Sequence, residues 1–273
     1  MDVPRKILVD SGATKVEWCV LEGGTVRDRF VTAGINFTSQ SADHAGRVLQ
    51  EAAARCGAGA AELHFFGAGL IGGDPAPLRT FFPGAEIECA SDLLAAARAV
   101  CGKEPGIACI LGTGSNSCAY DGREIVANVH PCGFILGDEG SAACLGKRFL
   151  GAFLKGQVPQ EVAEDFSGRF AADYATVVRE VYRSAAPARY LGSFAPYIVD
   201  WHGRNEWMTA LVEENFRDFF QIFLRQYDPV LPVGVVGSFG TACRAILEKV
   251  GDGIRFGRFM AAPMDGLIDY YSA

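Results

Sequence analysis

The chain has 273 residues, 49% of them hydrophobic, so it is long enough to bury one large core or two modest ones. Its formal net charge is −7 and no segment is rich in lysine and arginine, which argues against a nucleic-acid-binding protein. No apolar run approaches the ~20 residues that cross a bilayer, and we expect no signal peptide before the first strand. Nine scattered cysteines without a CxxC pair suit a reducing compartment, so we expect a cytoplasmic protein with free thiols.

The first predicted feature is a hairpin near the start of the chain. Apolar residues 7–9 predict a strand that ends at Asp10, and residues 16–21 predict its partner strand. An aspartate at such a turn often only bonds its own backbone, and the residues alone leave that explanation open. A third strand is expected over residues 27–32 and a helix over residues 42–55.

Asp92 stands at a second strand end. Residues 87–90 predict a short strand, and Ser91 and Asp92 begin a helix that Gly102 closes. Ser91 suits the N-cap, and a carboxylate in the first turn complements the helix dipole by ~0.3–1 kcal/mol. This structural explanation of Asp92 stands beside any catalytic one.

A second hairpin is predicted where the apolar strand 107–111 breaks. Its tip consists of small residues, Gly112, Thr113, Gly114 and Ser115. Such a tip exposes backbone N–H groups with no side chain in the way, which suits phosphate oxygens, although ordinary turns use the same residues. The first hairpin has the same order of strand, small-residue turn and strand, and an overlay places Gly12 on Gly114.

A glycine turn with two carboxylates follows about twenty residues later. Asp138 and Glu139 stand between two glycines, just before a helical pattern with Leu145, Phe149 and Phe153 four residues apart. Carboxylates on a glycine turn are well placed for a metal or a sugar hydroxyl, and a plain helix cap is the alternative.

The rest of the chain is predicted to be mostly helical, with one more strand. A helix over residues 206–226 is expected to bury an aromatic and aliphatic stripe, Trp207, Leu211, Phe219 and Phe223. The buried strand 233–236 leads to a turn at Gly237 and Ser238, and further helices are expected over residues 242–249 and 265–271.

Four motifs in this order resemble the sugar kinase, Hsp70 and actin superfamily. They are VDSGATK at 9–15, LGTGSNS at 111–117, GFILGDEGS at 133–141 and VVGSFG at 235–240. Within the superfamily, the chain is most similar to the BadF/BadG/BcrA/BcrD ATPase family and its N-acetylglucosamine kinase members. The resemblance implies an α/β fold with two ribonuclease H-like, actin-like ATPase domains and a cleft between them. We expect residues 1–104 with the C-terminal helix 261–273 in one domain and residues 105–260 in the other.

The resemblance also implies an activity: MgATP-dependent phosphorylation of an amino sugar at its primary hydroxyl. Asp92 would be the catalytic base and would contact the sugar, while Asp10 and Asp138 would hold Mg²⁺. ATP would be bound by Gly12, Ala13, Thr14, Lys15, Gly112, Thr113, Gly114, Ser115, Gly237 and Ser238. The sugar would be bound by Asn36, Gly133, Asp138 and Glu139.

The chain departs from the family pattern at several positions. Ser11 and Ala13 replace glycines of the first phosphate loop, and Phe134 stands where many relatives have a tryptophan, so the resemblance does not name the sugar. Two alternatives stay open: an activator ATPase that shares an iron–sulfur cluster across a dimer, and a sugar- or nucleotide-binding module without catalysis. The expected partner is a small sugar, with no membrane or nucleic acid, and a homodimer is left open.

Overall fold

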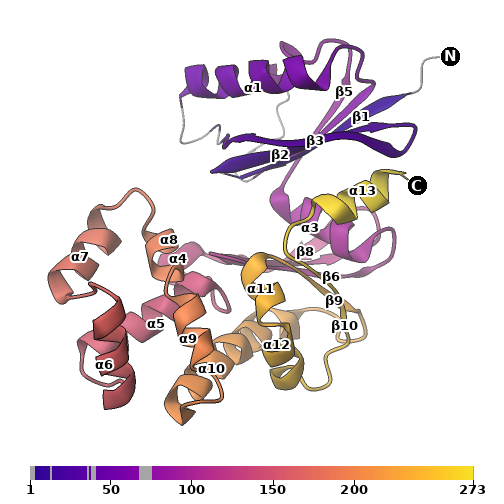
Figure 1. Cartoon of the computed structure of the whole chain (residues 1–273). Helices are drawn as coiled ribbons and strands as arrows, with labels where there is room; N and C mark the ends of the chain where they lie inside the picture. The colour runs from indigo at the N-terminus through magenta and orange to yellow at the C-terminus, as the bar shows by residue number, and fades with distance from the viewer. Residues whose placement is uncertain (1–3, 13, 36, 38–40, 68–75, 273) are drawn as a thin grey trace. The chain divides into compact units, whose positions relative to one another are not determined.

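The computed structural model describes residues 4–12, 14–35, 37, 41–67 and 76–272. The chain divides into two compact units, each with a five-stranded sheet (Figure 1). The first unit comprises Met1–Pro105, Tyr120–Ile125 and Ala262–Ala273, and the second comprises Gly106–Ala119 and Val126–Ala261. None of the helices in the described ranges combines the length and the apolar character that crossing a membrane requires.

The sheet of the first unit has the strand order β3-β2-β1-β4-β5. Its strands are β1 (Arg5–Ser11), β2 (Lys15–Glu22), β3 (Thr25–Ala33), β4 (Glu62–Gly67) and β5 (Glu86–Ala90). β1, β2 and β3 are antiparallel neighbours, and β4 and β5 continue the sheet parallel to β1. Because parallel strands end at the same edge of a sheet, the last residues of β1, β4 and β5 lie at one edge.

Both faces of this sheet are buried by helices. The helices of the unit are α1 (Ala42–Cys56), α2 (Ala76–Arg79), α3 (Asp92–Cys101) and α13 (Met264–Ser272). On one face, Ile7, Val9 and Trp18 form a core with α1, and on the other Leu8 packs with α3 and with Met264 of α13. Successive residues of β1 therefore serve two cores, as the period of a strand requires.

Polar side chains hold the C-terminal helix α13 to the first unit. Glu88 of β5 lies 2.7 Å from His64 Nδ1 and 2.8 Å from Arg98 of α3. Tyr271 of α13 donates its hydroxyl to the same carboxylate at 3.1 Å. Burial by itself would raise the pKa of Glu88, but the bonds from His64 and Arg98 outweigh it and lower the pKa to about 2. The last helix of the chain thus completes its first unit.

The sheet of the second unit has the strand order β10-β9-β6-β7-β8. Its strands are β6 (Gly106–Leu111), β7 (Ser115–Tyr120), β8 (Ile125–Asn128), β9 (Val233–Val236) and β10 (Phe256–Met260). β10, β9 and β6 are parallel. Gly112, which follows β6, and Gly237, which follows β9, therefore lie at one edge of the sheet.

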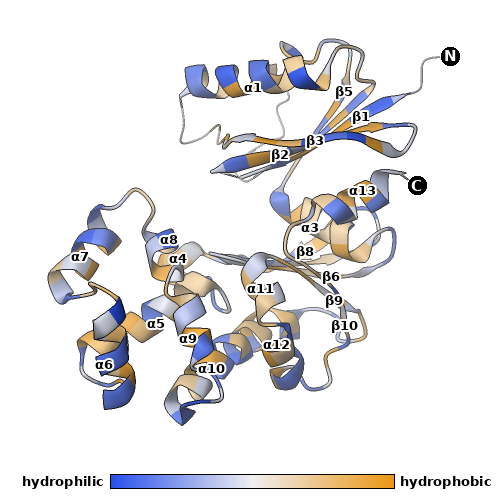
Figure 2. Cartoon of the chain, viewed as in Figure 1, coloured by the Kyte–Doolittle hydropathy of each residue, from blue (hydrophilic) through white to orange (hydrophobic). Residues whose placement is uncertain are grey.

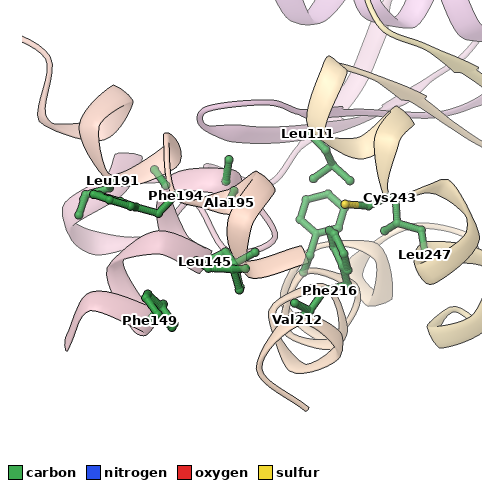
Figure 3. Close-up of a cluster of buried hydrophobic side chains, with 14 of the residues drawn as sticks. Leu111, Leu145, Phe149, Leu191, Phe194, Ala195, Val212, Phe216, Cys243 and Leu247 are labelled. Atoms are coloured by element: carbon green, nitrogen blue, oxygen red, sulfur yellow. The ribbon is translucent and has the colours of Figure 1, made fainter. Parts of the chain in front are cut away.

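Helices supply the rest of the second unit. They are α4 (Gly133–Leu136), α5 (Ala142–Leu154), α6 (Gln160–Arg169), α7 (Tyr174–Arg183), α8 (Pro187–Gly192), α9 (Ala195–Asp200), α10 (Glu206–Ile222), the 3₁₀ turn η1 (Leu224–Gln226), α11 (Ser238–Ala242) and α12 (Arg244–Val250). Most carry both polar and apolar residues (Figure 2), as expected for helices with one buried face. Leu111 of β6, Leu145 of α5, Phe216 of α10 and Leu247 of α12 belong to one core (Figure 3).

The long predicted helix differs from α10 in two details. It ends at Ile222 and continues as the 3₁₀ turn η1, instead of running on to residue 226. Phe219 and Phe223 are buried, but Trp207 and Leu211 are only half-buried, because the most buried face begins one residue later, at Met208. This helix packs into the core, as predicted. The sequence placed the middle of its buried face one residue too early.

Gly146 allows α8 to lie directly on α5. A Cβ added at Gly146 would lie 1.9 Å from the carbonyl oxygen of Leu191, a backbone atom that cannot rotate away. Although alanine is the better helix former by ~1 kcal/mol, Gly146→Ala is expected to lower the free energy of unfolding by about 1–3 kcal/mol in urea denaturation. In the same helix a Cβ at Gly151 would meet nothing within 4 Å, so Gly151→Ala should not destabilise. Equal losses in both variants would contradict this packing argument.

Candidate functional site

The first hairpin of each sheet has a tip of small residues. Three residues separate β1 from β2, and three separate β6 from β7. In the first tip Gly12 N–H donates to the carbonyl of Lys15, and in the second Gly112 N–H donates to that of Gly114, both at 3.0 Å. When the two hairpins are aligned by their strand ends, Gly12 corresponds to Gly112. The sequence overlay, which placed Gly12 on Gly114, was therefore wrong by two residues. The overlay matched glycines, whereas the fold repeats the strand ends.

The first loop accommodates a serine at its start. Ser11 is buried, and its hydroxyl donates to the carbonyl of Ile35 at 3.1 Å. Gly67 faces Ser11, and a Cβ added at Gly67 would lie 3.1 Å from the Cβ of Ser11. The missing side chain of Gly67 therefore leaves space for the serine. Of the predicted phosphate-binding residues here, the structure exposes Gly12, Thr14 and Lys15, and Ala13 falls outside the described residues.

Two carboxylates lie at the edge where the parallel strands of the first sheet end. Asp10 is the next-to-last residue of β1, and Asp92 follows β5 as the first residue of α3. Burial is the main reason that the pKa of Asp10 rises to about 6. The charges of Glu17 and Asp92 raise it further, and that of Lys15 lowers it. Acidic groups with such raised pKa values are typical of sites that move protons or bind cations.

The N-cap of α3 does not need Asp92. The side chain of Ser91 already accepts a bond from Leu94 N–H at 3.2 Å. Burial raises the pKa of Asp92, and bonds from the N–H groups of Leu93 and of Asp92 itself lower it. Asp92 as a residue is half-buried, at the edge where the parallel strands end.

In the second unit, the loop after β6 and the GDEGS turn form one structure. Ala142 N–H, at the start of α5, donates to the carbonyl of Gly112 at 3.0 Å. Ser115 N–H donates to Asp138 Oδ1 at 3.3 Å, and a Cβ at Gly114 would lie 3.1 Å from Asp138 Oδ2. The glycine therefore lets this carboxylate approach the loop. The structure thus joins two motifs that the sequence places about twenty residues apart.

Asp138 and Ser115 suit a cation and its phosphate. Asp138 is 7% exposed, and burial raises its pKa against the bond from Ser115 N–H. Ser115 Oγ is buried and has no hydrogen-bond partner in the described part of the chain, which is rare for a buried hydroxyl. No three His, Cys, Asp or Glu side chains converge on a metal site within those ranges. Mg²⁺ usually binds one or two carboxylates together with substrate phosphates, so these residues fit it.

The predicted sugar loop follows in the same unit. Gly133 is exposed with a φ of 69°, and Glu139 is half-buried. Lys147 of α5 donates its ammonium to the carbonyl of Phe134 at 2.7 Å, which ties α5 to this loop. Asn36, the other predicted sugar-binding residue, lies outside the described residues.

A cavity of about 550 Å³ lies in the second unit, within the ~300–1,000 Å³ range of small-molecule sites. Gly112 and Thr113 line it from the loop after β6, and Ser238 lines it from the start of α11. Gly237 has a φ of 125°, and a Cβ there would lie 2.3 Å from the carbonyl oxygen of Leu111. Only glycine therefore lets the two turns lie this close. Two predicted ATP-binding motifs, far apart in the sequence, share one cavity.

The opposite wall of this cavity was not found from the sequence. Gly192 at the end of α8 and Ala195, Val199 and Asp200 of α9 line it, and among the described lining residues only Asp200 is charged. The sequence predicted this segment only as part of a helical region. Its small residues, Gly192 and Ala195, were the one available hint.

Known proteins share this architecture over the whole chain. The profile of the BadF/BadG/BcrA/BcrD ATPase family matches residues 9–202. A candidate N-acetylglucosamine kinase of Porphyromonas gingivalis is 39% identical, with a TM-score of 0.87 over 97% of this chain and 98% of that one. A second candidate N-acetylglucosamine kinase, from Chromobacterium violaceum, is 22% identical, with a TM-score of 0.77 over 98% of this chain and 99% of the other.

No protein with a curated description matches the sequence. The solved structures confirm the predicted two-domain α/β fold class, and the profile match, which covers more than half of the sequence, confirms the resemblance drawn from the four motifs. The chain belongs to the BadF/BadG/BcrA/BcrD ATPase family.

Proposed function

We propose that the chain is an ATP-dependent sugar kinase that phosphorylates an amino sugar, N-acetylglucosamine or a close relative, at its primary hydroxyl. The observation that carries the proposal is the cavity of about 550 Å³ where Gly112, Thr113 and Ser238 meet. The name of the family supports ATP as the nucleotide. The 39% identity to a candidate N-acetylglucosamine kinase, over nearly all of both chains, supports the class of sugar.

In this proposal the cavity takes the adenosine and the loop after β6 takes the phosphates. Within the described part of the chain, the N–H groups of Gly112 and Ser115 already have acceptors, and those of Thr113 and Gly114 have none. These two N–H groups are therefore the donors left for phosphate oxygens. Ser115 Oγ, which has no hydrogen-bond partner among the described residues, is a further donor. In the first unit, the exposed Gly12, Thr14 and Lys15 would bind the phosphates together with Ala13.

Asp92 would act on the sugar hydroxyl. A free hydroxyl is a weak nucleophile, and a carboxylate that accepts its proton during attack increases the rate by ~10²–10⁴-fold. Burial raises the pKa of Asp92, which makes it a stronger base than an exposed aspartate. Phosphoryl transfer otherwise depends on positioning and charge neutralisation. Asp10 and Asp138 would hold Mg²⁺, which neutralises phosphate charge, and Asn36, Gly133, Asp138 and Glu139 would orient the sugar.

The iron–sulfur alternative receives little support from the cysteines. A four-iron cluster binds about four thiolates, so a cluster shared by two copies of the chain needs about two accessible cysteines from each. Of the nine cysteines, only Cys132 is exposed. A non-catalytic binding module could use Asp10 for a cation, but it would need no proton acceptor at Asp92, whose pKa burial raises.

The test measures ADP release from MgATP with glucosamine, N-acetylglucosamine, N-acetylmuramic acid, N-acetylmannosamine and glucose. We expect release that depends on an amino sugar, and a product whose phosphorus is coupled to the two protons of a CH₂ group in a ³¹P spectrum. ATP hydrolysis that no sugar changes would favour the activator ATPase, and nucleotide binding without turnover would favour the binding module.

A further inference from the structure

A second cavity, of about 410 Å³, lies at the other edge of the second sheet. Ile107 at the start of β6 and Val233 at the start of β9 line it, whereas the proposed nucleotide cavity lies beyond the ends of these strands. A strand rises ~3.3 Å per residue, so the length of β6 separates the two cavities by roughly 15–20 Å. They share no lining residue.

The lining of this second cavity is positively charged. Among the described lining residues, the guanidinium groups are Arg217 of α10, Arg225 of η1 and Arg255, which precedes β10, and the one carboxylate is Asp252. The C-terminal ends of α10 and α12 also lie here, and each contributes a partial charge of about −0.5. The positive charges still exceed the negative ones, on a protein whose net charge is −7.

Two of these arginines have no acidic partner within the described ranges. Arg225 makes no hydrogen bond or ion pair there, and Arg255 donates only to the carbonyl of Val230, at 2.8 Å. Arg217 pairs with Glu213 at 2.6 Å, but a lysine of α12 bonds the same carboxylate at 2.8 Å. The charge of Glu213 is therefore balanced without Arg217, and guanidinium groups remain for a ligand.

Apolar side chains also line the cavity. They include Phe220 and Leu224 from α10 and η1, and Ile254 from the segment before β10. We infer that this cavity binds a small phosphate monoester that carries an apolar or sugar body. Guanidinium groups match phosphate oxygens in pairs, a phosphate monoester carries a charge of about −1.5 to −2 at pH 7, and the apolar lining residues accept the organic part.

Calorimetry with phenyl phosphate tests this inference, because the probe combines a phosphate with an apolar ring. The wild-type protein saturated with MgADP should bind it, and should bind phenol and inorganic phosphate more weakly. Arg225→Gln and Arg255→Gln should each weaken binding by about tenfold, since each removes one charge-assisted contact. Arg183→Gln is the matched control: Arg183 is an exposed arginine of α7 without a partner in the described chain.

The inference fails if saturating MgADP abolishes binding, because the probe would then occupy the nucleotide site. It also fails if Arg225→Gln and Arg255→Gln bind as tightly as Arg183→Gln. The measurement needs no turnover, so its outcome is independent of whether the proposed kinase activity is found.

Discussion

Replacing Asp92 by asparagine is expected to lower kcat for sugar phosphorylation by about 10²–10⁴-fold. Asparagine keeps the size of the side chain but cannot accept the proton of the attacking hydroxyl. The dissociation constant of MgATP should stay within about twofold, because the lining of the proposed nucleotide cavity comes entirely from the second unit, whereas Asp92 belongs to the first. Steady-state kinetics with the best sugar of the panel, together with nucleotide titration, measure both quantities.

Asp43→Asn is the matched control for this variant. Asp43 lies in the first turn of α1, behind the N-cap Ser41, just as Asp92 lies in the first turn of α3 behind Ser91. Both variants remove a carboxylate that complements a helix dipole, an effect of ~0.3–1 kcal/mol on stability. Only Asp92→Asn should lose activity. A variant that keeps the kcat of the wild type would show that Asp92 serves α3 and is not the base.

The predictable part of the site is the part that local sequence determines. Asp10 and Asp92 each follow a short apolar run, and parallel strands end at a common edge, so the pattern of strands is sufficient to bring them together. The tip at Gly112 was predicted for a similar reason, since glycines after a buried strand indicate a tight turn with free N–H groups.

The remaining part depends on contacts between distant segments. The α8–α9 wall of the 550 Å³ cavity lies on α5 because Gly146 leaves room for the carbonyl of Leu191, and no local pattern reports which segment fills that room. The bond from Ser115 N–H to Asp138 likewise joins two turns that each resemble an ordinary turn. The buried face of α10 was misplaced for the same reason, because packing partners decide which of two adjacent apolar rows is covered.

Three of the predicted site carboxylates share an electrostatic property. Burial raises the pKa values of Asp10, Asp92 and Asp138, so each ionised carboxylate is destabilised in the folded protein without a ligand. A raised pKa in the folded state means that ionisation opposes folding. Such a cost is common where function requires a charge that a bound cation or substrate later balances.

Asp10→Asn should therefore stabilise the protein without ligands while it lowers activity. The pKa of Asp10 is about 6 in the folded protein, compared with 3.8 for an aspartate outside the fold. At pH 7.5 the ionised carboxylate therefore opposes folding by at most about 3 kcal/mol. We expect a gain of about 1–3 kcal/mol in the free energy of unfolding for the asparagine variant. Its activity should fall by at least about tenfold, because a magnesium ligand is lost.

The pH dependence of this gain identifies its cause. Above pH 6 the folded aspartate is ionised, and the advantage of asparagine should be complete. As the pH falls through 6 towards 3.8, the folded aspartate takes up its proton and the advantage should disappear. Asp28→Asn is the control. Bonding to Arg55 lowers the pKa of Asp28, so its ionised form favours folding and the asparagine variant should not be stabilised. Urea denaturation at pH 7.5 and pH 4.5 measures all three proteins. A gain for Asp10→Asn that is equal at both pH values would rule out ionisation of Asp10 as its source.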